Sequence, residues 1–118
     1  MDIVITNNPI VAEQFQGKFN VDYSEVDILE LLINVRDLIH KGHRLLSHPL
    51  SGSVKPNETC YKSVVITEQM EKVDFQSVGI IEDCIASVEK FPKKTFPKEY
   101  EKDMQIVDLS LIRSALDK

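Results

Sequence analysis

Two kinds of apolar spacing alternate along the chain. Short runs of strand-forming residues predict strands at 2–6, 20–23 and 63–67. Apolar residues three or four positions apart predict helices over 28–39 and 75–91. Ser24 or Asp27 can cap the first of these helices, and Asp74 the second. This alternation of strands and helices is typical of an α/β domain.

Weaker signals complete the first half of the chain. Pro9 suits the first turn of a helix, and the spacing after it predicts a short helix that ends at Gly17. Gly42 supplies a left-handed stop for the helix over 28–39. Residues 43–46 are too few for a helix and precede a proline, so they predict a brief strand that leads into a loop over 47–61.

The last third of the chain is less regular. The tract 92–102 is charged and interrupted by prolines, which predicts a surface connection. Residues 106–107 predict another short strand, and Asp108 is predicted to cap a last helix. The apolar residues expected to face inward from that helix are Leu109, Ile112 and Leu116.

These elements predict a single α/β domain over residues 1–118. We expect a three-layer sandwich in which flanking helices cover a mainly parallel sheet of about four or five short strands. In such a sheet, ligands usually bind at the carboxyl ends of the strands.

Composition narrows the class of protein. The chain has 118 residues, 42% of them hydrophobic and 28% charged, and a net charge of −5. We expect a soluble protein, because binding to nucleic acid or to a membrane surface usually requires a broad basic face. We expect no leader segment and no membrane-spanning helix, because the residues after Met1 are not a charged-then-apolar run and no apolar run is long enough to span a membrane. Cys60 and Cys84 lie far apart, so we expect two free thiols in a reduced compartment, the cytoplasm.

The distribution of charge is uneven. Lysine plus arginine against aspartate plus glutamate gives 2 against 7 for residues 1–40, 4 against 1 for 41–67, and 8 against 11 for 68–118. The middle segment is therefore +3, between flanks of −5 and −3. Such a reversal attracts small anions or acidic protein surfaces.

Within this basic segment, loop 43–57 has the composition of an anion site. It offers backbone N–H groups, hydroxyls and cations, and two asparagines after the first strand could face it across one edge of the sheet. The alternative is that these residues only form turns on a solvated face. The predicted ligand-binding residues are Asn7, Asn8, Arg44, Ser47, His48, Ser51, Gly52, Ser53, Lys55 and Asn57.

A metal site and a nucleophilic site are two other interpretations of this part of the chain. The spacing of His40, His43 and His48 matches no standard ligand pattern, and we expect neither a metal nor a cofactor. Ser47 adjoins His48, but adjacent residues of a strand point to opposite faces, and the chain contains no Gly-x-Ser-x-Gly elbow. Covalent catalysis is therefore the weaker interpretation.

Three segments carry a resemblance to a known family. They are Ile5-Thr-Asn-Asn-Pro9, Ile39-His-Lys-Gly-His-Arg-Leu-Leu-Ser-His-Pro-Leu-Ser-Gly-Ser-Val-Lys-Pro-Asn-Glu58 and Asp108-Leu-Ser-Leu-Ile-Arg-Ser-Ala-Leu116. With these segments the chain resembles the GrdX family over essentially its whole length. The resemblance implies a small accessory protein, without an assigned reaction, of the glycine, sarcosine and betaine reductase system of amino-acid-fermenting anaerobes. It carries over no catalytic residue.

Two functions remain open from the sequence. The first is an accessory protein that holds a small anion, or an acidic surface of a reductase subunit, through loop 43–57. The second is a small enzyme acting on a phosphorylated or carboxylated metabolite, with His48 as acid or base and Asn8, Ser51 and Lys55 positioning the substrate. The oligomeric state cannot be read from the sequence.

Overall fold

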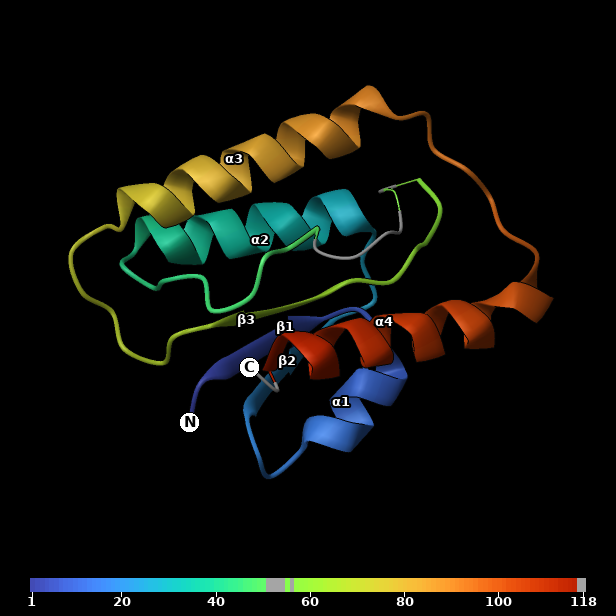
Figure 1. Ribbon diagram of the computed structural model, residues 1–118, viewed down its shortest axis with the longest axis horizontal. Coiled ribbons are helices and arrows are strands. Elements are labelled where there is room, and N and C mark those ends of the chain that lie inside the picture. Colours follow the sequence, from blue (N-terminus) through green and yellow to red (C-terminus); the bar gives the residue numbers. More distant parts are fainter. Residues whose placement is uncertain (51–54, 56, 117–118) are drawn as a thin grey trace.

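The computed structural model describes residues 1–50, 55 and 57–116. Three strands alternate with α-helices in its first two thirds, and helices form the rest (Figure 1). The elements are β1 (Ile3–Thr6), α1 (Pro9–Phe15), β2 (Asn20–Tyr23), α2 (Ile28–His40), β3 (Ser63–Ile66), α3 (Phe75–Lys90), the 3₁₀ turn η1 (Lys98–Tyr100) and α4 (Glu101–Leu116).

The three strands form a mixed sheet in the order β2-β1-β3. β1 runs parallel to β2, with Ile3 opposite Asn20, and antiparallel to β3, with Thr6 opposite Ser63. The predicted sheet of four or five mainly parallel strands is therefore wrong. The chain after α2 passes along the outer edge of β3 before it turns back into that strand, so β3 runs against β1.

Residues 43–46 make this edge contact without forming a full strand. Leu45 forms an isolated antiparallel bridge with Ile66, and the N–H of Leu46 donates to the carbonyl of Val65 at 2.8 Å. Ser47 then ends the ladder, because its hydroxyl accepts the N–H of Val65 at 2.9 Å. The predicted strand is thus reduced to one bridge.

The predicted strand at 106–107 is also wrong, since both residues lie inside α4. Ile106 and Val107 are 49% and 44% exposed, on the outer face of that helix. Asp108 does not cap the helix; it lies in its middle and is buried with Met104 and Ile112. A carboxylate at a core position disguised the helical period. The predicted surface connection continues only to Pro97, where η1 begins to lead into α4.

Two apolar clusters hold the domain together, one on each face of the sheet. Ile5, Val64 and Ile66 pack against α2 and α3. Val4 and Val65 point to the opposite face and pack against α1 and α4. This follows from the alternation of side chains along a strand, and it explains why β1 and β3 are apolar on both faces except at Thr6 and Ser63.

Several local predictions are confirmed. Asp27 caps α2, its Oδ1 accepting the N–H of Glu30 at 2.8 Å, and Asp74 caps α3 through the N–H of Ser77 at 3.1 Å. Gly42 follows α2 with φ of 115°, and an added Cβ would overlap the carbonyl of Glu71.

Within the part of the chain that the structure describes, no helix is both long and apolar enough to cross a membrane.

Candidate functional site

A chain of buried polar groups lies at the carboxyl end of β1. The N–H of Asn8 donates to Thr6 Oγ1 at 2.9 Å, and Thr6 Oγ1 lies 2.7 Å from Ser63 Oγ. Ser63 Oγ donates to Asp108 Oδ2 at 2.8 Å, and Asn8 Nδ2 donates to the same oxygen at 3.0 Å. When Asp108 is ionised, Ser63 donates its one hydroxyl proton to it, so Thr6 is then the donor to Ser63. The hydrogen bonds therefore run in one direction and end on the carboxylate.

Two ionisable groups in this cluster have perturbed pKa values. Burial raises the pKa of Asp108, and hydrogen bonds from Asn8 and Ser63 and the charge of Lys62 oppose that rise only in part. Lys62 is 3% exposed, and burial lowers its pKa, whereas the charge of Asp108 acts in the opposite direction. Burial thus favours the neutral form of each group, and a perturbed pair beside an opening is a common feature of functional sites.

The cluster reaches the surface at a small polar opening. The opening is lined by His48, Lys62, Ser63 and Asp108, among others, and its volume is about 10 Å³. That is space for about one water molecule. His48 is exposed, and its Nδ1 accepts the N–H of Leu50 at 3.2 Å. Asn8 is not among the residues that line this opening, although its amide contacts Asp108, which is.

The amide of Asn7 joins three segments of the chain. Its Nδ2 donates to the carbonyls of Val26 and Cys60, both at 2.9 Å, and its Oδ1 accepts the N–H of Lys62 at 2.9 Å. Asn8 is equally occupied, because its Oδ1 also caps α1. Both asparagines are buried and hold the cluster together from within.

A second cavity lies beside this cluster, between the start of α2, the end of α3 and residues 57–60. Its volume is about 150 Å³, and we call it the lysine cavity. Its lining is mostly apolar, and two exposed lysines belong to it; Lys93 Nζ lies 3.4 Å from Asp27 Oδ2. The lining residues are Asp27, Ile28, Leu29, Asn57, Thr59, Cys60, Val88, Phe91, Pro92, Lys93, Lys94 and Phe96.

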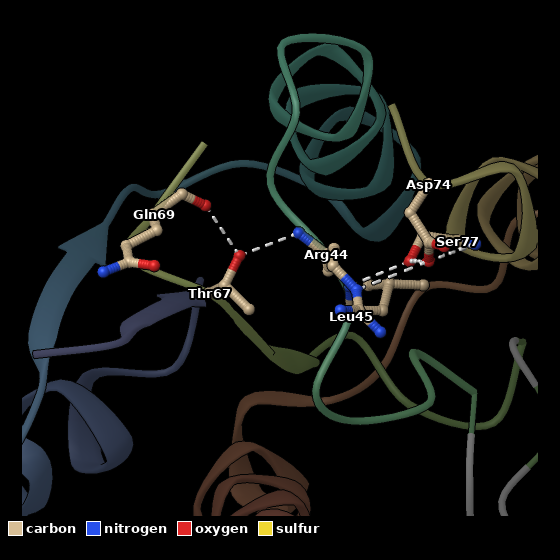
Figure 2. A network of polar contacts seen from close by, with 6 residues as sticks. All are labelled: Arg44, Leu45, Thr67, Gln69, Asp74 and Ser77. Atoms are coloured by element: carbon tan, nitrogen blue, oxygen red, sulfur yellow. Dashed lines mark hydrogen bonds and ion pairs between the residues drawn. The ribbon is translucent and has the colours of Figure 1, made fainter. Parts of the chain in front are cut away.

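Arg44 lies at the other end of the sheet, beside Thr67, which follows the last residue of β3, and Figure 2 shows its contacts. Its N–H donates to Thr67 Oγ1 at 2.9 Å, and its side chain faces Asp74, with Nε 3.9 Å from Oδ2. The hydroxyl and N–H of Ser77 lower the pKa of Asp74, and Arg44 adds a smaller effect. Arg44 therefore does not join Asn7 and Asn8 in one site.

The other predicted residues are dispersed. Ser47 is buried against β3, and Lys55 is exposed, with its carbonyl accepting the N–H of Glu58 at 2.9 Å. Asn57 belongs to the lysine cavity. Ser51, Gly52 and Ser53 lie outside the described residues. Among those that are described, no three or more histidine, cysteine or acidic side chains are grouped closely enough to hold a metal.

The family model of the GrdX-like proteins matches residues 3–117. The chain belongs to this GrdX-like protein family. The name of the family suggests an association with the glycine reductase system. The match covers the three segments that carry the resemblance in the sequence. Comparison with curated proteins and with solved structures gives no match.

Several residues of the buried polar cluster and of the lysine cavity in this GrdX-like chain were not predicted from the sequence. Asp108 was detectable, because it occupies a position between Met104 and Ile112 where helical spacing calls for an apolar residue. Lys62 directly precedes the strand Ser63–Ile66, which is apolar after its first residue, and this is a weaker signal. Lys93 and Lys94 gave no signal beyond charge, since their importance comes from the cavity beside them.

Proposed function

We propose that this GrdX-like protein is a noncatalytic accessory protein of the glycine, sarcosine and betaine reductase system. It binds an acidic partner surface, or a small anion, through the basic loop 43–57 and the lysine cavity beside it. The observation that carries this proposal is the lysine cavity itself, a space of about 150 Å³ whose lining includes Asn57 from that loop.

The chemistry of the cavity supports a partner that combines an apolar side chain with carboxylates. The segment 90–98 contains four lysines and no acidic residue. Its Phe91 and Phe96 line the cavity together with Val88, so an apolar group can be buried there while the lysines attract the surrounding charge. Complementary charge of this kind guides association and fixes the orientation of a complex.

Binding fits this cavity better than covalent chemistry does. Cys60 is its one thiol among the lining residues, and burial together with the charge of Glu101 raises the pKa of that thiol. A raised pKa keeps the thiol protonated and makes it a poor nucleophile. Asp27 already caps α2 and faces Lys93. Asp27 thus stabilises the fold, the Cys60 thiol is unreactive, and the lysines are left to attract negative charge.

The proposal is tested by measuring the affinity of the purified protein for each reductase subunit. Replacing Lys93 and Lys94 by glutamate should weaken binding roughly tenfold, at about 0.5–1 kcal/mol for each exposed charge. The control is Lys18→Glu, an equally exposed charge reversal in the turn between α1 and β2. Equal affinities for all three proteins, or no complex with any subunit, would contradict the proposal.

The small-anion form of the proposal has its own test. Phosphate, acetyl phosphate and glycine are screened for a rise in melting temperature. A rise that disappears in Arg44→Ala or Lys55→Ala supports a ligand site in the basic loop. A rise that persists in both variants places the ligand elsewhere and contradicts this form.

The second candidate is the small enzyme with His48 as acid or base and Asn8, Ser51 and Lys55 positioning the substrate. The observation that favours it is the opening shared by His48, Lys62 and Asp108. We place it second, because the opening accommodates about one water molecule and the amide of Asn8 is occupied internally. Unchanged turnover of a stabilising metabolite in His48→Ala would eliminate it.

A further inference from the structure

Exposed apolar side chains gather where β3 leads into α3. Met70 is 62% exposed, Val73 is 40% exposed, and Phe75, at the first position of α3, is 84% exposed. We call these three residues the apolar knob. Large apolar side chains exposed together often mark a surface that contacts another protein.

The charge around the knob is opposite to the charge around the lysine cavity. The segment 68–74 contains three acidic residues and one lysine; Glu68 and Glu71 are exposed, and Glu68 also pairs with the N-terminal ammonium of Met1. The segment 90–98 beside the cavity carries four lysines. The knob thus combines what the cavity selects: a protruding apolar group and neighbouring carboxylates.

The size of the cavity suits the ring of Phe75. An apolar cavity of about 150 Å³ is large enough to hold a benzene molecule, which has the dimensions of a phenyl side chain. The volume of the lysine cavity is about 150 Å³. Phe91 and Phe96 in its lining can contact an entering ring edge to face, as aromatic pairs prefer.

The knob cannot enter the cavity of its own chain. The two lie at opposite ends of α3, which has 16 residues and is therefore about 24 Å long. Figure 1 shows these ends on opposite sides of the molecule. A contact between knob and cavity must therefore join two copies.

We propose that copies of this protein associate head to tail, with Phe75 of one copy in the lysine cavity of the next. Glu68 and Glu71 then face Lys93 and Lys94. Such a contact leaves a knob and a cavity free at the two ends of each assembly, so it can repeat. It uses the cavity of the proposed function, and self-association therefore competes with partner binding, but it does not depend on that function. The association is weak, because a knob of three residues buries far less than the roughly 1,200 Å² of a stable interface.

Sedimentation equilibrium over a dilution series tests the proposal. The average mass of the wild type should rise above the monomer mass of 13.5 kDa with concentration, and less steeply at high salt. Phe75→Ser should remain a monomer, as should the Lys93→Glu/Lys94→Glu double variant. The matched control is Ile106→Ser, which removes an apolar side chain that is 49% exposed on α4 and should assemble like the wild type. All substituted side chains are exposed, and circular dichroism confirms that each variant is folded.

Mixing the two monomeric variants gives the sharpest test. Phe75→Ser retains an intact cavity, and the double variant retains an intact knob, so the mixture should form one-to-one dimers that grow no further. A wild type that stays monomeric at every concentration, a Phe75→Ser protein that assembles normally, or a mixture that stays monomeric would each overturn the proposal. Binding of Phe75→Ser to reductase subunits reports on the proposed function alone, so the two proposals can fail separately.

Discussion

The buried carboxylate of Asp108 can be tested by replacing it with alanine. The substitution removes the acceptor of two hydrogen bonds, from Asn8 and from Ser63, at 3.0 and 2.8 Å. It also removes the charge that chiefly offsets the effect of burial on the pKa of Lys62, which is 3% exposed. Hydrogen bonds to a charged group contribute about 1.5–3 kcal/mol each.

These contributions overlap, because both arise from the same carboxylate. We therefore expect Asp108→Ala to lower the free energy of unfolding by about 3–5 kcal/mol. Asp108→Asn should cost less, because the amide oxygen can still accept from Ser63. The matched control is Asp103→Ala, an exposed acid on the same helix, which should change stability by less than about 0.5 kcal/mol.

Urea unfolding at neutral pH measures all four proteins, and the slope of each transition shows whether a change lies in stability or in compactness. A loss below about 1 kcal/mol for Asp108→Ala, with an unchanged slope, would refute the assigned role of the carboxylate. Measuring the free energy of unfolding over a pH series adds a second test, because the direction of its change is predicted. The folded pKa of Asp108 is raised, so the part of its stabilisation that depends on protonation is fully present below the ordinary value of 3.8 and is lost as the pH rises through the folded pKa, whereas its hydrogen bonds from Asn8 and Ser63 remain. The wild type should therefore lose stability relative to Asp108→Asn across that rise.

Three further predictions concern other buried positions. Gly42→Ala should lower the free energy of unfolding by more than about 1 kcal/mol, because its Cβ would overlap the carbonyl of Glu71, whereas Gly79→Ala, in open space on α3, should raise it by about 0.5–1 kcal/mol. Equal effects of the two substitutions in urea unfolding would contradict the assigned role of Gly42. The folded pKa of Lys62 is lowered, so the wild type should become more stable as the pH rises from that pKa toward 10.5, and Lys62→Met should lack this gain. A gain in stability that persists in the variant would show that another group causes it. Burial raises the pKa of Cys84 to about 11, so mass spectrometry should find Cys84 unmodified after iodoacetamide treatment at pH 8 and modified once urea unfolds the chain.

Local patterns predicted the elements whose cause is local. The apolar spacing over 28–39 and the acids Asp27 and Asp74 locate two helices, because amphipathic spacing and caps act within a few residues. Gly42 ends the first of these helices for the same reason. The direction of β3 could not be predicted, since it depends on how the chain after α2 passes along the edge of the sheet.

The candidate site was only partly accessible from the sequence. The apolar run before Asn7 and Asn8 correctly placed them at the end of β1. Their side chains, however, form hydrogen bonds with Cys60 and Asp108, which lie far away in sequence. Asp108 lies 100 residues beyond Asn8, and no local pattern joins them. The lysine cavity likewise depends on two helix ends and a loop that meet only in the folded chain, so its lysines had no distinguishing signal.

The central claim is that the lysine cavity binds an acidic partner surface of the reductase system, and crosslinking from the cavity tests it most directly. Phe96 is replaced by a photoreactive phenylalanine analogue, and the variant is irradiated with the reductase subunits and digested for mass spectrometry. We predict a crosslink to a segment of a subunit that contains more acidic than basic residues. The same analogue at Ile106, on the exposed face of α4, should give none. A crosslink of equal yield from both positions, or none from position 96, would contradict the claim.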